Sequence, residues 1–319
     1  MRKRTPLWRS TPPAIFPVAL GFMGLGLAWR NASGVVDIPH EIGDLLLGFS
    51  TAFYVYFLAM YLVKLIGRPG ALFDDMKSAP ARAGVAAIAM SMMLLAAALL
   101  PFGISVPQVW WTGVVLQIGA SAIVIHAIWH EAPEIRAYTP FQYQTFVGPI
   151  VGPVAGIPLG FVTESILLAY AALIAFIIIS VGYSRRLIRV RPPIPLRPSL
   201  VIALAPPCLF ALCFGQLGYD GMFWAFYWAA WILALVLLSL ARWLSKGGWT
   251  PIWGAFTFPI ATFSNMQVMA LAKGGGDIAT VGIYVGLALG TPLILYIVYK
   301  SGLAWVTGDL AKKSGATVA

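Results

Sequence analysis

The residue types that most often carry chemistry are few and scattered in this sequence. His126 and His130 are four residues apart, so on a helix they would share one face and could hold a metal ion together. The third histidine, His40, lies in a distant loop and does not complete a ligand set. We therefore favour two interfacial histidines over a metal site, and we expect neither a metal nor another cofactor.

The cysteines and carboxylates do not suggest an active site either. Cys208 and Cys213 lie within one apolar stretch, which is typical of small packing residues rather than of a disulfide or a metal site. Asp44 and Glu164 lie within about one turn of a predicted helix end, away from the midplane position where transporters place ion-binding groups. With no acid–base or metal set, we do not expect an enzyme.

The composition indicates an integral membrane protein. Apolar residues make up 60% of the 319 residues, charged residues only 10%, and the mean hydropathy is +0.85. A soluble domain carries roughly 25% charged residues, whereas a membrane span needs about 20 mainly apolar residues to cross about 30 Å of hydrocarbon. Hydropathy predicts ten spans, near 13–30, 42–66, 82–101, 107–129, 144–161, 164–184, 198–217, 221–244, 249–272 and 278–300.

The fifth predicted span, 144–161, has an unusual composition for a helix. It contains Pro149, Pro153 and Pro158 together with four glycines. A broken helix of this kind is tolerated at bilayer depth where neighbouring helices bury it or where it lines a cavity. We therefore expect a broken helix that faces the interior of the protein.

The basic residues predict the orientation. Of the 21 lysines and arginines, 19 fall on one side of the ten-span arrangement, and only Arg30 and Lys273 fall on the other. Cytoplasmic loops carry the excess of basic residues, so we expect both termini in the cytoplasm of a cell with a bacterial-type inner (plasma) membrane. The same rule explains the net charge of +10 without a nucleic-acid partner. We expect one transmembrane domain over 1–319, with cytoplasmic tails at 1–12 and about 302–319.

Proline divides the predicted spans into two kinds. Eight prolines lie inside odd-numbered spans and one, Pro292, lies inside an even-numbered span. Proline removes a backbone donor and kinks a helix, and water in a pore or a neighbouring helix can satisfy the freed carbonyl. We therefore expect kinked odd spans around a central axis and straighter even spans outside. The prolines of the odd spans are Pro17, Pro149, Pro153, Pro158, Pro206, Pro207, Pro251 and Pro259.

A pore with these properties would suit anions. Its lining would carry almost no charge, which avoids trapping a permeating ion too tightly. The basic cytoplasmic side would raise the local anion concentration. The tenth span carries the glycine ridge Gly282, Gly286 and Gly290, which favours close helix packing rather than a direct functional role.

Several short motifs resemble one known family over essentially the whole chain. The ninth span carries the run WGAFTFPIATFSN from Trp253 to Asn265. It is similar to the Trp-x-x-aromatic-Ser-Phe-(Gly/Pro) pattern of the family that contains the bacterial tellurite-resistance protein TehA and the plant slow anion channels, also named the tellurite-resistance/dicarboxylate transporter (TDT) family. Three further matches are Leu20-Gly21 with Leu27-Ala28-Trp29, Pro80-Ala81-Arg82 and Leu204-Ala205-Pro206.

The resemblance implies an all-α membrane fold of five helical hairpins with quasi-fivefold symmetry around a central pore, assembled as a homotrimer. It also implies that Phe258 closes the pore. Phe256 would point about 200° away on the same helix, so at most one of the two faces the axis. The predicted pore-lining residues are Pro17, Gly21, Pro149, Pro153, Pro206, Pro207, Pro259 and Thr262.

Two departures from the family pattern affect the expected pore shape. Ala89 stands where family members place a proline in the third span, so the kink of that span would be weaker or made otherwise. In the first span Pro17 stands where a glycine is usual, and Ala19 where the proline is usual.

Two functions remain open from the sequence. The first is a channel for small inorganic or carboxylate anions, closed by Phe258. The second is a proton-linked carrier or exporter of C4-dicarboxylates, sulfite or tellurite. A dicarboxylate carrier would want fixed cations near the midplane, and the predicted spans offer none, so the channel is favoured.

Overall fold

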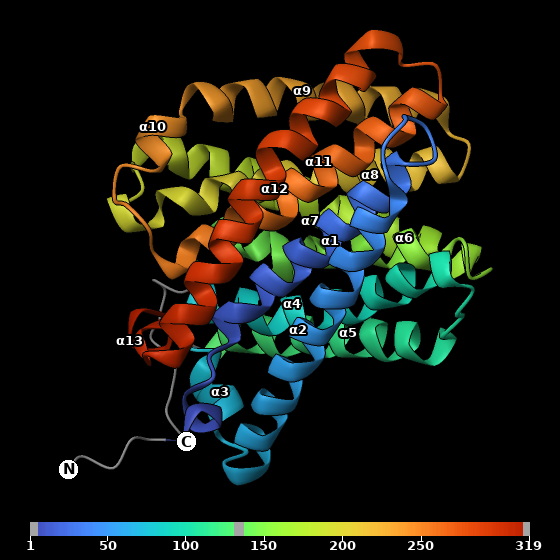
Figure 1. Ribbon diagram of the computed structural model, residues 1–319. Helices are drawn as coiled ribbons and strands as arrows, with labels where there is room; N and C mark the ends of the chain where they lie inside the picture. The colour runs from blue at the N-terminus through green and yellow to red at the C-terminus, as the bar shows by residue number, and fades with distance from the viewer. Residues whose placement is uncertain (1–5, 131–136, 315–319) are drawn as a thin grey trace.

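The computed structural model describes residues 6–130 and 137–314, and it is helical throughout with no β-strand in those two ranges (Figure 1). Within these two ranges, eight helical stretches are long and apolar enough to cross a membrane. Each falls on a span that hydropathy predicts. The eight are Pro13–Ala32, His40–Gly67, Ala79–Phe102, Pro107–Trp129, Val162–Arg189, Ile194–Gln216, Asp220–Ser239 and Gly276–Val306.

The other two predicted spans, 144–161 and 249–272, are helical but do not reach the length and apolarity of the eight. The first is divided into the π-helix η5 (Tyr143–Val147), the 3-10 helix η6 (Gly148–Val151) and the short helix α6 (Gly152–Gly156). The second consists of the 3-10 helix η8 (Pro251–Trp253) and helix α11 (Gly254–Ala272). Helix α11 is less apolar because it carries Thr257, Thr262, Ser264, Asn265 and Gln267.

Five connections gather at one end of the molecule, at the right and upper right of Figure 1. They join each odd-numbered predicted span to the even-numbered span that follows it, so the spans pair as helical hairpins. We name this the hairpin end. The opposite end, which holds α3 (Ala71–Asp75), α10 (Ala241–Leu244) and α13 (Asp309–Ser314), is named the terminal end.

Burial separates the helices into two sets, as the proline pattern predicts. The odd spans that contain α1 (Phe16–Ala32), α4 (Ala79–Leu99) and α8 (Ala205–Gln216) are 78%, 67% and 94% buried, whereas the five even spans are only 22–33% buried. We call α1, α4, η5–α6, η7–α8 and η8–α11 the inner helices, where η7 is Ile194–Leu204. The outer helices are α2 (His40–Gly67), α5 (Pro107–His130), α7 (Val162–Arg189), α9 (Asp220–Ser239) and α12 (Gly276–Val306).

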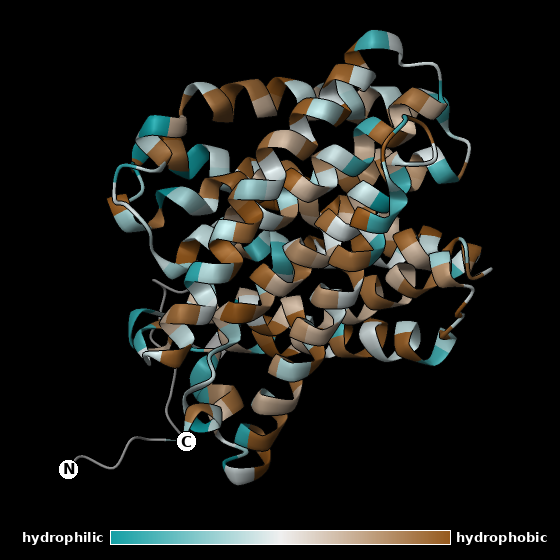
Figure 2. Ribbon diagram, viewed as in Figure 1, coloured by the Kyte–Doolittle hydropathy of each residue, from teal (hydrophilic) through white to brown (hydrophobic). Residues whose placement is uncertain are grey.

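The exposed faces of the outer helices are apolar. Figure 2 shows hydrophobic ribbon along the bodies of the helices and more hydrophilic ribbon near the two ends. Leu45, Ile174, Leu235 and Leu289 are each at least 57% exposed, on four different outer helices. A surface of this kind is stable against lipid and unstable against water, so the chain is a multi-pass membrane protein.

Small residues allow the helices around α11 to approach closely. A Cβ on Gly21 of α1 would overlap the side chain of Thr257 and the backbone nitrogen of Phe258. On α12, Gly282, Gly286 and Gly290 face three successive turns of α11; their nearest side chains there are Gln267, Ser264 and Ile260. The glycine ridge therefore packs α12 against α11, which is the packing role that the sequence predicts.

The broken fifth span is supported by side chains of α5. Gln117 donates to the carbonyls of Gln144 and Thr145 at 3.2 and 2.8 Å, and Ser121 donates to the Thr145 carbonyl at 2.8 Å. Trp110 donates to the Gly152 carbonyl at 2.8 Å. Because lipid offers no donors, these bonds supply partners that a continuous helix would have found in itself.

Candidate permeation pathway

The inner helices enclose a wide cavity toward the hairpin end, which we call the hairpin-end cavity. Its volume is about 570 Å³. All five inner helices or the turns that directly follow them contribute to its lining, whereas none of its lining residues lies on an outer helix. Asn31 and Ala272 in its wall are exposed, so the cavity opens at that end. Its lining includes Gly24, Leu27, Leu94, Val154, Pro158, Leu212 and Met269.

Toward the terminal end the space between the inner helices becomes narrow. A middle cavity of about 20 Å³ is lined by residues of α4, of the broken fifth span, of η7–α8 and of α11. A terminal-end cavity of about 30 Å³ follows, and Pro17, Pro80 and Pro251 contribute to its wall. Each of these spaces is about large enough for one or two water molecules.

Phe258 and Leu209 separate the wide cavity from the narrow ones, because both side chains line the hairpin-end cavity and the middle cavity. Phe258 is only 4% exposed and Leu209 only 3%. Gly24 of α1 makes room for the ring: a Cβ at Gly24 would lie 3.4 Å from Cδ2 of Phe258. One aromatic and one aliphatic side chain therefore lie where the wide cavity gives way to the narrow ones.

Hydroxyl groups fix the backbone around Phe258. The Thr262 hydroxyl donates to the carbonyls of Phe258 and Pro259, each at 3.0 Å. The Thr257 hydroxyl donates to the Pro17 carbonyl of α1 at 3.0 Å and to the Gly254 carbonyl at 2.8 Å. Pro259 removes the N–H that would bond the carbonyl four residues earlier, and a hydroxyl bonded back onto its own helix favours a bend. Hydroxyl groups thus hold the backbone of α11 on both sides of Phe258.

None of the residues that line these three cavities carries a charge. The polar groups in the hairpin-end cavity are Asn31, Gln216, Thr262 and Asn265. The Asn265 amide donates to the carbonyls of Gly24 and Ala261 at 3.0 and 2.9 Å, and its oxygen accepts from Asn31 at 3.0 Å. The pathway is therefore lined by apolar side chains with a few neutral hydrogen-bonding groups.

The fully buried ion pair between Lys64 and Asp75 lies away from these cavities. The Lys64 Nζ is 2.8 Å from Asp75 Oδ2, and both side chains are 0% exposed. Tyr61 donates to the same carboxylate oxygen at 3.2 Å, and Lys64 also donates to the Thr11 carbonyl at 3.3 Å. The pair links α2, α3 and the chain before α1, so its position indicates a structural role.

The structure brings some of the sequence-predicted site residues together. Phe258 and four of the eight predicted pore-lining residues line these cavities: Pro17 lines the terminal-end cavity, Pro206 and Pro259 line the middle cavity, and Thr262 lines the hairpin-end cavity. The remaining predicted pore residues lie outside the lining of the cavities described above. They are Gly21, Pro149, Pro153 and Pro207.

The two phenylalanines of the ninth span face different surroundings, as their helical spacing predicts. Phe258 lies at the boundary between cavities, whereas Phe256 packs beside the cluster of Leu200, Val201 and Leu244. Sequence reasoning missed Leu209 and Asn265. The signal for Asn265 was present, because Phe258, Thr262 and Asn265 recur at helical spacing on one face of α11.

The histidines and cysteines give no metal centre in the described part of the chain. No group of three or more metal-ligating side chains gathers among those residues. The side chain of His130 lies outside the described residues, so the interpretation of the His126 and His130 pair stays a prediction. Cys208 and Cys213 are buried and unpaired, which fits packing residues.

These features define a class of protein: a helical multi-pass membrane protein with an uncharged row of cavities along its interior. The family model SLAC1, described as voltage-dependent anion channel, matches residues 10–300. Because that match covers most of the chain, the protein belongs to the SLAC1 family, which includes TehA and the TDT proteins, and the resemblance predicted from the ninth span is confirmed. A search of curated proteins gives no match.

Proposed function

We propose that this protein is a channel for small anions and that Phe258 is its gate. The observation that carries the proposal is the uncharged row of cavities that changes from about 570 Å³ to about 20 Å³ at Phe258 and Leu209. The match to the voltage-dependent anion channel family supports the anion as the permeating species.

The lining suits rapid permeation. An ion that enters an apolar passage loses part of its hydration, and neutral amides and hydroxyls replace only some of it. Binding is then too weak to hold the anion, so it can leave as readily as it enters. A benzene ring at the constriction excludes water, and a change of its rotamer or a small movement of α11 would open the passage.

We further propose that the broken fifth span and α11 complete ten crossings in a quasi-fivefold arrangement. Three features support this. The five hairpin connections lie at one end, all five inner helices contribute to one cavity, and the burial of inner and outer helices differs throughout. By the distribution of basic residues, the terminal end faces the cytoplasm.

The assembly and the membrane follow from the family resemblance. We propose a homotrimer with one pathway in each subunit, embedded in a bacterial-type inner membrane. The apolar exposed faces of the outer helices offer surface for both lipid and neighbouring subunits.

One observation favours a carrier as the alternative. A wide cavity that is open at one end and closed at the other would suit a protein that occludes a substrate such as a C4-dicarboxylate, sulfite or tellurite. A proton-linked carrier also needs an ionisable group on the pathway. The described residues that line the three axial cavities include none, and the buried Lys64–Asp75 pair lies elsewhere, so the channel is the better supported function.

Electrical recording of the purified protein in planar bilayers tests the proposal. We expect little anion current from the wild type and a current at least about tenfold larger from Phe258→Ala, because removal of the ring opens the constriction. Phe256→Ala is the matched control: the ring is lost from the same helix, but from a face away from the cavities, and the current should stay at the wild-type level.

The outcomes separate the two functions. If neither the wild type nor Phe258→Ala conducts anions, and the wild type moves labelled malate or sulfite against its gradient with protons, the carrier reading replaces the channel. If Phe256→Ala raises the current as much as Phe258→Ala, the gate assignment is wrong.

A further inference from the structure

A fourth cavity lies at the terminal end, beside the three that follow the axis. Its volume is about 240 Å³. It is enclosed by the start of α4, the last turns of α5, the chain that leads into η5 and the last turn of α7. Among its described lining residues, Phe141 alone also lines an axial cavity, the one at the terminal end. The fourth cavity is therefore a separate space.

The charge of this cavity differs from that of the axial cavities. Lys77, Arg82 and Arg186 line it, and no acidic residue does so in the described part of the chain. Ala79 in the same wall begins α4, whose N-terminal backbone N–H groups add a partial positive charge. We call this cavity the basic pocket. Its field favours an anion.

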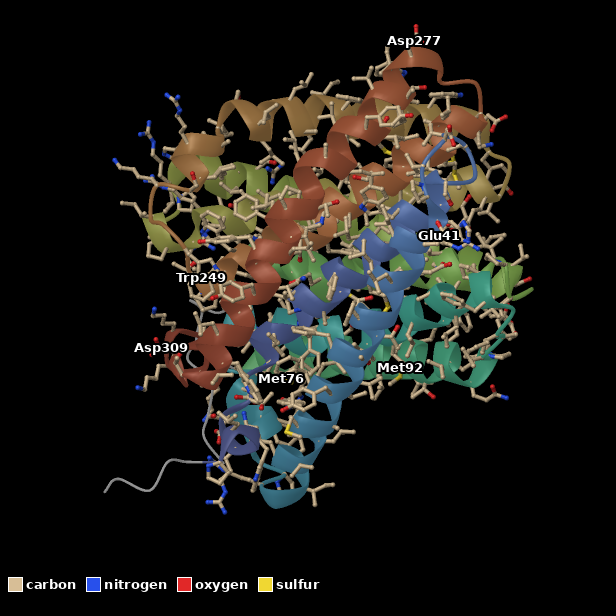
Figure 3. All side chains as sticks on the ribbon, in the orientation of Figure 1. Glu41, Met76, Met92, Trp249, Asp277 and Asp309 are labelled. Carbon is tan, nitrogen blue, oxygen red and sulfur yellow. The ribbon has the colours of Figure 1, made fainter. Side chains whose placement is uncertain are left out.

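Main-chain carbonyls hold the two arginines in place. Arg82 is only 9% exposed, and its Nη1 donates to the carbonyl of Met76, which Figure 3 labels, at 3.2 Å. The Arg186 Nη1 donates to the Tyr138 carbonyl at 2.7 Å. A guanidinium that is already positioned loses little freedom when it binds a further acceptor.

The third cation, Lys77, shares its carboxylate with another basic residue. The Lys77 Nζ lies 2.7 Å from Asp74 Oδ1, and Arg68 Nη2 lies 2.6 Å from Asp74 Oδ2. The Lys77 side chain is 71% exposed, and an exposed ion pair of this kind is weak. Lys77 can therefore turn from Asp74 to an anion in the pocket while Asp74 keeps Arg68.

Neutral groups complete a wall that suits phosphate. Thr139, Gln142 and Thr145 line the basic pocket and bring hydroxyl and amide donors. Phosphate oxygens accept charge-assisted hydrogen bonds from arginine and lysine, and further bonds from neutral donors. The pocket has several times the volume of roughly 30 Å³ that one water molecule occupies in the liquid, so a phosphate group fits.

The position of the pocket favours a lipid as the source of the phosphate. On α5, Ile125 and Trp129 are exposed next to the lining residues of that helix, and on α7 the exposed Ile178 lies two turns before Arg186. An apolar face that ends in aromatic and basic residues marks the level of the lipid headgroups. Acyl chains can lie along these faces while the phosphate enters the pocket.

We propose that the basic pocket binds the phosphate group of an anionic phospholipid from the leaflet at the terminal end. Basic pockets between transmembrane helices bind such headgroups on the cytoplasmic side of membranes. The site also touches the broken fifth span, because Thr145 lines the basic pocket and the preceding residue, Gln144, lines the middle cavity. A bound headgroup would brace the segment that forms part of the pathway wall.

Native mass spectrometry of the full chain in detergent tests the proposal, with dioleoylphosphatidic acid and dioleoylphosphatidylcholine supplied in equal amounts. We expect the wild type to retain phosphatidic acid at least about tenfold more than phosphatidylcholine, the effect of one hydrogen bond to a charged group. Arg186→Gln should lower this retention by about tenfold for the same reason. Arg82→Gln should lower it too, but Arg82 is buried, so the partly exposed Arg186 carries the test if that variant does not fold.

Arg242→Gln is the matched control. Arg242 is exposed on α10 at the terminal end and does not line the basic pocket. The substitution removes one positive charge from the same end of the protein, and retention should stay at the wild-type level. Equal retention of the two lipids by the wild type, or an equal loss in Arg242→Gln and Arg186→Gln, overturns the proposal.

Inorganic phosphate separates the two sources of the phosphate group. At millimolar concentration it should leave the lipid adduct in place, because it lacks the acyl chains that hold the lipid on α5 and α7. If inorganic phosphate displaces the lipid, and raises the unfolding midpoint of the wild type but not that of Arg186→Gln, the lipid assignment is overturned in favour of a soluble phosphate. None of these outcomes depends on anion current, so the channel function stands or fails separately.

Discussion

Phe258 lies beside a glycine of the neighbouring helix α1. A threonine one turn further along α11 bonds the backbone carbonyl of Phe258. The absence of a side chain at Gly24 leaves the ring in contact with the α1 backbone region, and the Thr262 hydroxyl holds the Phe258 carbonyl. If Phe258 is the gate that we propose, a substitution at Gly24 that adds a side chain would restrict the ring more than one at Thr262 would.

Gly21 gives a test of the packing between α1 and the segment of α11 that contains Phe258. A Cβ on Gly21 would overlap Thr257 and the backbone of Phe258, so neither neighbour can move aside easily. We expect Gly21→Ala to destabilise the protein by about 1–3 kcal/mol, the usual range for overpacking. The measurement is the thermal unfolding midpoint in detergent.

Gly119→Ala serves as the comparison for that variant. Gly119 lies on the outer helix α5, and a Cβ there would meet no atom within 4 Å. Its unfolding midpoint should not fall. Equal midpoints for Gly21→Ala and the wild type would mean that α1 and α11 are less tightly packed than described.

At the scale of elements, the broken fifth span depends on α5 for its hydrogen bonds. The side-chain amide of Gln117 donates to the carbonyls of Gln144 and Thr145. Gln117→Leu keeps a similar volume but leaves the Gln144 carbonyl without this partner. We expect a loss of about 1–3 kcal/mol in stability, the cost of an unsatisfied buried polar group, again measured as an unfolding midpoint.

Gln108→Leu is the control at this scale. Gln108 lies on the same helix but is exposed near its start, so its loss should leave the midpoint within experimental error of the wild type. A midpoint for Gln117→Leu that matches Gln108→Leu would show that water or other groups satisfy the broken span.

The elements also show how far sequence reasoning reaches. Eight spans, the inner position of the proline-rich spans and the packing role of Gly282, Gly286 and Gly290 were predictable, because hydropathy, proline and small-residue spacing act locally. The repair of the fifth span by Gln117 was not, since it depends on which outer helix lies against it. That Leu209 joins Phe258 at the boundary between the two cavities likewise depends on the tertiary arrangement of α8 and α11.

At the scale of the whole molecule, the structure separates two ends with different charge. Figure 3 places Glu41 and Asp277 toward the hairpin end and Trp249 and Asp309 toward the terminal end. Lys300 and Lys313 lie over the Trp249 ring at 5.4 and 5.9 Å, as basic and aromatic residues do at a membrane interface.

The orientation can be tested by labelling. In a Cys208→Ala/Cys213→Ala background, a membrane-impermeant maleimide added to intact cells should label Ser105→Cys and not Ala241→Cys. Ser105 is exposed between α4 and α5 at the hairpin end, and Ala241 is exposed on α10 at the terminal end. Labelling of Ala241→Cys alone would reverse the orientation, and labelling of both would contradict the separation of the two ends.

The unequal cavities also decide where a membrane voltage acts. A wide water-filled space conducts well and supports little potential difference, whereas a narrow apolar passage supports most of it. With about 570 Å³ open on the hairpin side of Phe258 and spaces of about 20 and 30 Å³ beyond it, we expect the voltage across the proposed channel to fall mainly from Phe258 toward the terminal end. An impermeant anion that blocks from the hairpin side therefore crosses little of the field, and its block should depend only weakly on voltage.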